Sequence, residues 1–369
     1  MLENAGADTD RAPEPTASSA VHFRPFDLKD KEEAINLLSI GRPDGYRALK
    51  ARLFDWQFLA NPHQDGRPPF VVGELDGRIV ALNGFMPARV RYHGKPVEAC
   101  WSCDTYVSGE HRGKGIGKQL IAQVTKSAPL MLGYGISDMS DPIFEKFQWT
   151  KHSDIELVFC HLAETGLRGK IKNAVSRVAA LRSVRLHGAD YDVIETASPE
   201  FVSQVDELWA RSADGYLSTV ARDGAYVRWK YFEHPFYRYT AYAMRSGADL
   251  KATLIVRHDP VEAVIVDYVG PASDEDAIAS LAVEVARDAA DRDTTRIKCE
   301  STHKPLISAL KRVGFIGSPY ASRFRVRDNS EDVDALAGWL LMPGDSDGDL
   351  LVSTTLETEA RVAGSSEVA

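Results

Sequence analysis

The chain has little cysteine: four residues among 369. Cys100 and Cys103 stand in a C-x-x-C pattern, but no second pair or histidine cluster completes a zinc site. Their spacing falls within a strand pattern, which places the two side chains on opposite faces of a sheet. We therefore predict buried cysteines and no metal site.

The sequence also lacks long apolar runs and an excess of basic residues. No window approaches the roughly 20 apolar residues of a membrane-spanning helix. The acidic N-terminal segment does not resemble a secretory signal, so we expect a cytoplasmic protein. Lys and Arg number 44 against 53 Asp and Glu, giving a net charge of −9. Because general nucleic-acid binding needs a basic face, we expect no nucleic-acid partner.

Composition divides the chain into two folded units, a tail at each end and a basic linker between the units. Residues 1–21 are rich in Ala, Pro, Ser and Thr and predict a disordered N-terminal tail. Residues 329–369 predict an acidic C-terminal tail, with a short helix over 333–342. The basic linker 161–189 has apolar residues at helical spacing. It predicts either an interdomain helix or loop with a solvated face, or a contact with a phosphorylated substrate or with anionic lipid, the latter as a peripheral membrane contact through 167–186.

A weak internal repeat organises the region between the two tails. Trp56–Pro62 and Trp229–Pro235 both read W-x-[FY]-x-x-[NH]-P. In each copy strand-like runs, an aspartate-bearing strand and an apolar helix follow in the same order. Each copy closes on a similar signature, Glu145–Trp149 and Lys311–Phe315. We predict two copies of one mixed α/β unit, over 22–160 and 190–328, with both tryptophans serving mainly as packing anchors.

One copy carries a glycine-spaced turn between a strand and a helix. It reads Arg112-Gly113-Lys114-Gly115-Ile116-Gly117, followed by Lys118. Alternate glycines leave the backbone bare, so successive N–H groups can point at one anion at the start of a helix. The basic side chains increase the positive potential there. The spacing fits neither a Walker loop nor a dinucleotide-binding motif, and it predicts a pyrophosphate site.

The R-x-x-G-x-G pattern of residues 112–117, after a strand that ends at Val107, resembles the GNAT superfamily of coenzyme A-dependent N-acyltransferases. This resemblance implies an α/β (α+β mixed sheet) fold, with two tandem GNAT-like domains. The second domain lacks the pyrophosphate loop, reading Val269–Asp274 at that place. It further implies that the backbone of Tyr106 and Val107 pairs with the pantetheine arm of acetyl-CoA. The pyrophosphate would bind the loop residues: Arg112, Gly113, Lys114, Gly115, Ile116, Gly117 and Lys118.

The family mechanism is direct attack by a neutral amine, so Cys103 is not expected to be a nucleophile. Deprotonation at pH 7 costs roughly 4.6 kcal/mol for a lysine-like amine and about 1 kcal/mol for an α-amine. Asp104 is the candidate base or amine anchor, with a purely structural role as the alternative; Asp267 at the matching place favours the latter. The family's acidic tyrosine is replaced by Phe144, which leaves Tyr134 as a candidate acid.

By resemblance, the expected function is transfer of an acetyl group from acetyl-CoA to a primary amine. The preferred acceptor is a small molecule, such as an amino sugar or a nucleotide-linked amino sugar. Two alternatives remain at this point: a Fem-type aminoacyltransferase that uses aminoacyl-tRNA, and a non-catalytic coenzyme A-binding module. The sequence leaves the acyl length and the oligomeric state open.

Overall fold

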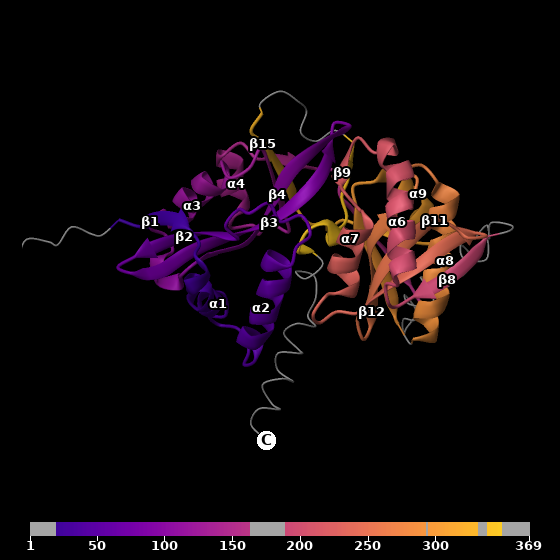
Figure 1. Ribbon diagram of the computed structural model, residues 1–369, viewed down its shortest axis with the longest axis horizontal. Helices are drawn as coiled ribbons and strands as arrows, with labels where there is room; N and C mark the ends of the chain where they lie inside the picture. Colours follow the sequence, from indigo (N-terminus) through magenta and orange to yellow (C-terminus); the bar gives the residue numbers. More distant parts are fainter. Residues whose placement is uncertain (1–19, 163–188, 293, 331–337, 349–369) are drawn as a thin grey trace, which may run out of the picture.

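The computed structural model describes residues 20–162, 189–292, 294–330 and 338–348. The predictions for the N-terminal tail, for most of the basic linker and for residues 349–369 therefore lie outside the described residues. Figure 1 shows two sheets, each flanked by helices, in one molecule. Among the described residues no helix combines the length and the apolar character needed to cross a bilayer.

The first sheet is mostly antiparallel, with β4 and β5 as a parallel pair. Its strands lie in the order β1 (His22–Pro25), β2 (Phe70–Leu75), β3 (Arg78–Tyr92), β4 (Lys95–Val107), β5 (Leu130–Tyr134), β15 (Phe324–Asp328) and β6 (Thr150–His152). A side branch adds β9 (Ser218–Val220) and β16 (Trp339–Leu340). The associated helices are α1 (Lys31–Leu38), α2 (Tyr46–Phe54), α3 (Ile116–Val124) and α4 (Asp141–Lys146).

The second sheet repeats this plan, with β12 and β13 as its parallel pair. Its order is β14 (Ile316–Ser318), β7 (Glu156–His161), β13 (Arg296–Ser301), β12 (Glu262–Val269), β11 (Asp249–His258), β10 (Tyr239–Ser246) and β8 (Asp190–Ile194). The helices are α6 (Pro199–Ser212), α7 (Gly224–Val227), α8 (Glu275–Asp291) and α9 (Lys304–Arg312). The mixed α/β fold class predicted from the sequence is confirmed.

Strands cross between the two halves of the chain, beyond β9 and β16 of the side branch. β7, which follows β6 in the chain, pairs with β13 and β14 of the second sheet. β15, from the C-terminal half, pairs with β5 and β6 of the first sheet. Boundaries at residues 160 and 190 therefore do not separate two self-contained sheets. Each sheet needs a strand from the other half of the chain to become continuous.

The repeated tryptophan motif forms the same local structure in both copies. Each motif lies on a π-helical turn, η2 (Asp55–Leu59) and η5 (Arg228–Phe232). The side chain at the [NH] position then accepts a hydrogen bond from the backbone N–H two residues later: Asn61 from His63 at 2.8 Å, and His234 from Phe236 at 3.2 Å. This shared role explains why the two motifs tolerate either residue at that position.

The closing signatures also correspond in structure. Gln148 and Gly314 follow α4 and α9 with φ values of 61° and 101°, in the left-handed region. The next residue then donates its N–H back to the helix, Trp149 to Phe144 O and Phe315 to Leu310 O, both at 3.1 Å. Both helices thus end in a left-handed cap, although only the second copy uses the glycine that this conformation favours.

The segment after Gly338 contradicts the predicted solvated tail. Residues 339–346 are buried, and Asp345 has no exposed surface. Arg222, which also pairs with Asp267, contacts this carboxyl group, since its Nη2 lies 2.7 Å from Asp345 Oδ1. The tail was predicted from the number of acidic residues in this segment, and nothing in the sequence showed that Arg222 pairs with one of them. The expected helix over 333–342 is replaced, within the described residues, by the short strand β16.

The cysteine prediction holds for all four residues, which are buried free thiols. Cys100 packs in the cluster beside α3, whereas Cys103 belongs to the core on the other face of the first sheet. The strand periodicity of the sequence therefore assigned their faces correctly. Both tryptophans of the repeat are buried as predicted, with exposed fractions of 6% for Trp56 and 2% for Trp229.

Candidate functional site

The parallel strands β4 and β5 separate at their carboxyl ends. Their pairing runs from Ala99–Leu130 to Trp101–Leu132 and then stops, while β4 continues to Val107. A β-bulge in β4 lies just beyond that point, because Asp104 and Thr105 stand opposite one residue of β3. Asp104 has a φ of 50° there. A bulge bends its strand and increases the local twist, so this one accounts for the opening between β4 and β5.

A tight turn joins the open end of β4 to α3. A 3-10 turn (η3, Gly109–His111) is followed by Gly113 and Gly115, whose φ values are 78° and 81°. Other residues adopt this conformation only with strain, so glycine is required at both positions. Gly115 is the N-cap of α3, and its carbonyl accepts from Gln119 N at 3.2 Å. The N–H groups of the first helical turn lack intrahelical acceptors and point out of the helix end.

A cavity of about 430 Å³ lies at this turn. The predicted cofactor-binding residues line it, with the exception of Lys114. Its opposite side comes from the loop before α4 and from α4 itself. The lining residues are Thr105, Tyr106, Val107, His111, Arg112, Gly113, Gly115, Ile116, Gly117, Lys118, Ile121, Ser137, Met139, Ser140 and Ile143.

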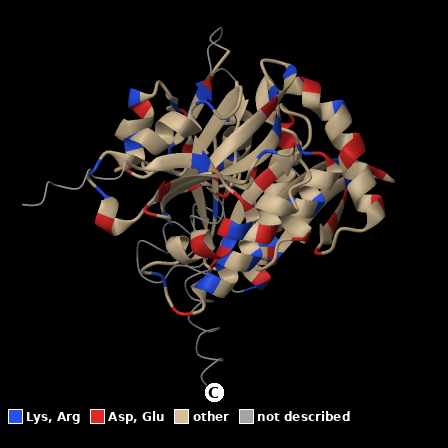
Figure 2. Cartoon of the chain, turned by 60° about the vertical axis from the view of Figure 1, so that its left-hand side comes forward, with Lys and Arg blue, Asp and Glu red and all other residues tan. Residues whose placement is uncertain are grey.

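No carboxylate of the described residues pairs with the cations around the turn. Arg112 donates from Nε to Val107 O at 3.0 Å, and its guanidinium lies over the Tyr106 ring at 5.4 Å. Lys114 Nζ is 3.4 Å from His111 Nδ1. Within the part of the chain that the structure describes, neither these residues nor Lys118 form an ion pair. Elsewhere on the described elements both signs of charge are interspersed (Figure 2).

The predicted base, Asp104, is engaged by a lysine that sequence reasoning missed. Lys50 of α2 is buried, and its Nζ lies 2.5 Å from Asp104 Oδ2. Burial alone would lower the pKa of Lys50, but the nearby negative charges, Asp104 first among them, raise it above its ordinary value. Lys50 is therefore charged and neutralises the aspartate. No sequence motif connected the two residues, which lie on separate elements.

The second copy has a similar pair at the matching aspartate. Asp267 is buried and accepts from Arg222 Nε and from the Tyr231 hydroxyl, both at 2.7 Å. Asp267 directly follows a register shift in β12, and Asp104 lies within the corresponding bulge of β4. Both copies thus hold a cation-paired aspartate at the point where the parallel strands diverge. This parallel favours a structural role for Asp104.

Tyr134, the candidate acid, ends β5 at the border of the opening. Its hydroxyl donates to Glu300 Oε2 of β13 at 2.8 Å, and Ser322 Oγ donates to the same oxygen at 2.9 Å. Burial, together with the charge of Glu300, raises the pKa of Tyr134 well above its usual range. The proton is therefore firmly held. Glu300 was also missed by sequence reasoning, although a glutamate within a buried strand is an unusual residue that could have been noticed.

Two further side chains near the opening, Cys103 and Phe144, supply neither a nucleophile nor an acid. Burial raises the pKa of Cys103 well above its usual range, so this thiol stays protonated. Phe144, at the position of the family's tyrosine, packs edge-on against Trp149 at 4.8 Å. No group of three or more potential metal ligands occurs among the described residues.

The turn that corresponds in the second copy is closed by side chains. Tyr216 donates to Gly270 O at 2.7 Å, and Tyr268 donates to Pro271 O at 3.0 Å. Asp274 then caps α8 by accepting from Ala277 N at 3.0 Å. A carboxylate thus occupies the helix end that receives the anion in a phosphate-binding loop.

Comparison with known proteins agrees with this geometry. Residues 32–136 match the model of the Acetyltransferase (GNAT) family. This stretch is a GNAT domain. It contains β2 to β5, the glycine turn and α3, and so most of the residues that line the cavity; the side formed by residues 137–143 follows directly after it. No curated protein sequence matches the chain.

Solved structures with the same fold cover most of the chain. A GCN5-related N-acetyltransferase from Anabaena variabilis is 11% identical, with 84% of this chain and 73% of that chain covered and a TM-score of 0.59. A probable N-acyltransferase from Enterococcus faecalis is 13% identical, with the same coverages and TM-score. N-myristoyltransferase of Saccharomyces cerevisiae, solved with myristoyl-CoA and inhibitors, is 14% identical, with coverages of 91% and 86% and a TM-score of 0.59. The GNAT acyltransferase fold thus extends over both halves.

Proposed function

We propose that this protein transfers an acetyl group, or another acyl group, from coenzyme A to the nitrogen of a primary amine. The observation that carries the proposal is the cavity at the glycine turn, where exposed amides and unpaired cations meet the opening between β4 and β5. Amides at a helix start suit the pyrophosphate of coenzyme A. The unpaired end of β4 offers backbone groups to the pantetheine arm.

In the proposed reaction one N–C bond forms and one C–S bond breaks. The amine loses a proton, and the departing thiolate ends as a free thiol. A thiol with a pKa of about 8.5 leaves without a strong acid, which fits the firmly held proton of Tyr134. In this proposal a backbone N–H near the β4 bulge polarises the thioester carbonyl. Because Lys50 neutralises Asp104, α-amine-like acceptors of lower pKa suit this site better than lysine-like amines.

The experiment is thiol release with purified protein, acyl-CoA donors of graded length and a panel of amines. Mass spectrometry of the amines then identifies the acylated product. Donors from acetyl-CoA to myristoyl-CoA are compared, since the yeast enzyme of the same fold was solved with myristoyl-CoA. Calorimetric binding of a donor together with amine-dependent thiol release supports the proposal. Binding of no donor overturns it.

A non-catalytic coenzyme A-binding module is the second candidate. It is favoured by the pairing of Asp104 with Lys50 and by the firmly held proton of Tyr134, since neither side chain is free for proton transfer. This candidate predicts tight donor binding without turnover on any amine. The proposed cytoplasmic location and a peripheral membrane contact through 167–186 remain separate predictions.

A further inference from the structure

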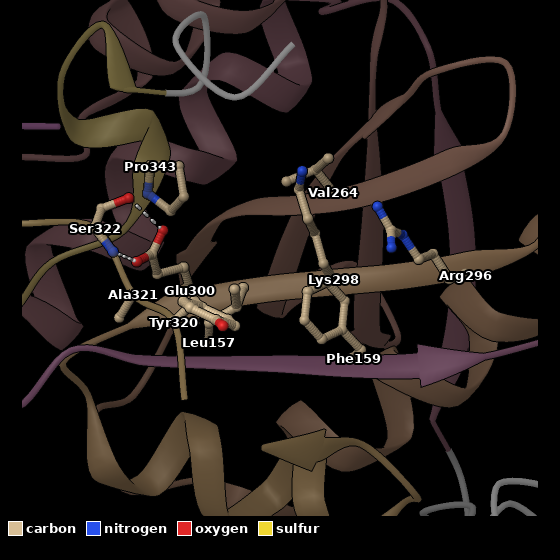
Figure 3. Close-up of a pocket in the computed structure, with 10 residues that line it drawn as sticks. All are labelled: Leu157, Phe159, Val264, Arg296, Lys298, Glu300, Tyr320, Ala321, Ser322 and Pro343. Atoms are coloured by element: carbon tan, nitrogen blue, oxygen red, sulfur yellow. Dashed lines mark hydrogen bonds between the residues drawn. The ribbon is translucent and has the colours of Figure 1, made fainter. Parts of the chain in front are cut away.

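A second cavity, of about 320 Å³, lies on the face of the second sheet away from α8 and α9 (Figure 3). Alternate residues of β13 set this geometry: Ile297 and Cys299 pack into the core with those helices. Residues 296, 298 and 300 therefore face the cavity. The exchanged strand β7 supplies the apolar part of the floor. The lining residues are Leu157, Phe159, Val264, Arg296, Lys298, Glu300, Tyr320, Ala321, Ser322 and Pro343.

One end of this cavity carries surplus positive charge. Arg296 and Lys298 both pair with the same carboxylate, Glu262. One carboxylate is therefore shared by two cations, which leaves one positive charge unbalanced by this group. Lys298 is only 8% exposed, and the Arg296 guanidinium lies over the Phe159 ring at 5.2 Å. An anionic group entering this end would gain charge-assisted hydrogen bonds in a partly dehydrated setting.

The other end is acidic and adjoins the first sheet. Glu300 lines the cavity while accepting the Tyr134 hydroxyl at 2.8 Å and the Ser322 hydroxyl at 2.9 Å. Tyr134 itself borders the opening between β4 and β5. Glu300 and Lys298 are two residues apart on one strand, a step of roughly 6.6 Å. The cavity therefore has a basic end suited to an anion and an acidic end suited to an amine. The acidic end is linked to the opening between β4 and β5 by the hydrogen bond from Tyr134 to Glu300.

We propose that this cavity is the acceptor site, and that its ligand is a small primary amine that also carries a carboxylate or phosphate. The anionic group binds Arg296 and Lys298, while the amine lies toward Glu300. The volume is near the lower end of the range for small-molecule pockets, and polycationic amines are disfavoured by the two cations. This inference rests on the proposed function, because it assigns the acceptor of that reaction.

The test is an NMR titration of the protein without donor, using three amines of similar length. 4-Aminobutyrate has both groups, butylamine lacks the anion, and 1,4-diaminobutane has a second cation instead. We expect 4-aminobutyrate to bind at least tenfold more tightly than either of the others. A parallel titration with 3-aminopropyl phosphate distinguishes a phosphate from a carboxylate ligand. Equal affinities for 4-aminobutyrate and butylamine would overturn the proposal.

Two variants with opposite expected effects separate recognition from folding. Lys298→Met removes one cation but keeps a side chain of similar length. It should weaken the binding of 4-aminobutyrate about tenfold and leave the affinity for butylamine unchanged. Glu262→Gln releases both cations from their shared partner, and should strengthen 4-aminobutyrate binding. A merely structural role would weaken binding in both. Arg296→Gln, at a half-exposed residue, gives a third variant if Lys298→Met does not fold; unchanged binding in either cation variant would refute the site.

The outcome is distinguishable from that of the proposed function. If 4-aminobutyrate binds as expected but no donor releases thiol, the proposed acyl transfer is wrong and the proposed binding site is supported. If thiol is released with neutral or polycationic amines, and these cavity variants leave the KM for the amine unchanged, the transfer stands and the site assignment fails. A shift of the amine KM without a change in the donor KM supports both.

Discussion

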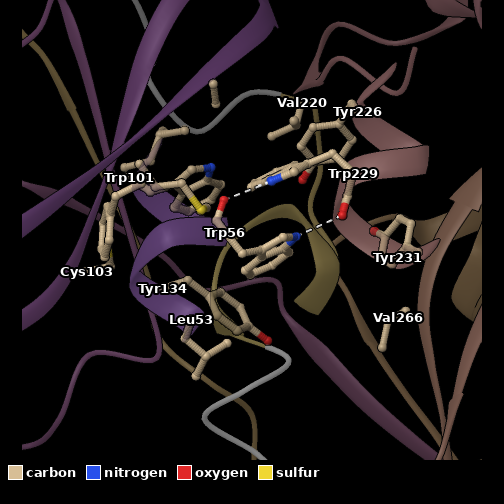
Figure 4. Packing of buried hydrophobic residues seen from close by; sticks show 14 of the residues in the cluster. Leu53, Trp56, Trp101, Cys103, Tyr134, Val220, Tyr226, Trp229, Tyr231 and Val266 are labelled. Carbon is tan, nitrogen blue, oxygen red and sulfur yellow. Dashed lines mark hydrogen bonds between the residues drawn. The ribbon is translucent and has the colours of Figure 1, made fainter. Parts of the chain in front are cut away.

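Trp56 and Trp229 exchange hydrogen bonds with each other's backbone. Each indole Nε1 donates to the carbonyl of the other residue, at 2.9 and 3.0 Å, and the rings stack at 4.9 Å (Figure 4). Two equivalent positions of the internal repeat thus meet at an approximate twofold relationship. The repeat motif therefore serves to join the halves, which explains why it occurs in both.

Replacement of either tryptophan should destabilise the whole molecule. Trp56→Phe or Trp229→Phe removes an indole donor and leaves a buried carbonyl unpaired, at a cost of roughly 1–3 kcal/mol. Because the two residues share both bonds, the double variant should depart from additivity by at least ~0.5 kcal/mol. Urea unfolding measures this, with the half-buried Trp209→Phe as control. Additive single effects would show that the pair does not couple the halves.

Donor binding should be lost when a carboxylate is placed at Gly117. Its backbone is helical, and an added Cβ would meet only side-chain atoms, the nearest at 3.8 Å. Gly117→Glu should therefore fold normally and lower acyl-CoA affinity at least tenfold through charge repulsion and bulk. Calorimetry with acetyl-CoA checks this. Gly109→Glu, outside the cavity lining and also open around its Cβ, is the matched control and should bind the donor normally.

The Lys50–Asp104 pair should behave as a structural unit. Lys50→Met leaves a half-buried carboxylate unpaired and should destabilise by several kcal/mol, whereas the double variant with Asp104→Asn should recover part of the loss. Urea unfolding gives these energies. The pH dependence of thiol release supplies the second readout. If Asp104→Asn instead abolished the acidic limb of that profile with little loss of stability, Asp104 would be the base after all.

The left-handed caps predict opposite effects for reciprocal substitutions. Gln148→Gly removes the strain of a φ of 61° and should stabilise the protein by about 0.5–1 kcal/mol. The loss of the 3.2 Å hydrogen bond from Arg327 to Gln148 Oε1 offsets part of this gain. Gly314→Gln should destabilise by at least as much. Thermal unfolding of both variants tests this. Destabilisation by Gln148→Gly would mean that the side-chain contact outweighs the backbone strain.

The buried carboxylate Asp345 should make stability fall as pH rises. Burial, with the nearby charge of Asp267, raises its pKa to about 7, despite the opposing effect of Arg222. The folded protein therefore binds this proton more tightly than the unfolded chain, whose carboxyl titrates near 3.9. The stabilising contribution of the protonated form is complete below pH ~4 and is lost as pH rises to about 7.

Asp345→Asn mimics the protonated side chain and removes this dependence. The free energy of unfolding of the variant, relative to the parent, should rise between pH 4.5 and 7.5 in urea titrations. The comparison cancels the contributions of other carboxyl groups. A constant difference across this range would show that Asp345 does not titrate there.

The sequence predicted the features that depend on local pattern. Strand periodicity placed Cys100 and Cys103 on opposite faces, and the alternate glycines of residues 113–117 marked a turn before a helix. The repeat placed Trp56 and Trp229 in the core. Each of these follows from residues near one another in the chain, where sterics and amphipathic spacing act directly.

The missed features depend on partners that are distant in the chain. Lys50 meets Asp104 only because α2 packs beside the β4 bulge, and Arg222 pairs with Asp345 although the two residues are more than a hundred positions apart. Strand pairing could not be predicted either, because the sequence patterns of β7 and β15 indicate a strand but do not determine which strand lies beside it.

The strand exchange has a consequence for biosynthesis. During translation, β5 and β6 emerge from the ribosome long before β15, the strand that lies between them. Until then the N-terminal half exposes an unpaired sheet edge, of the kind that recruits strands from other chains. The nascent protein must therefore be held apart from its neighbours until almost the entire described chain has been made.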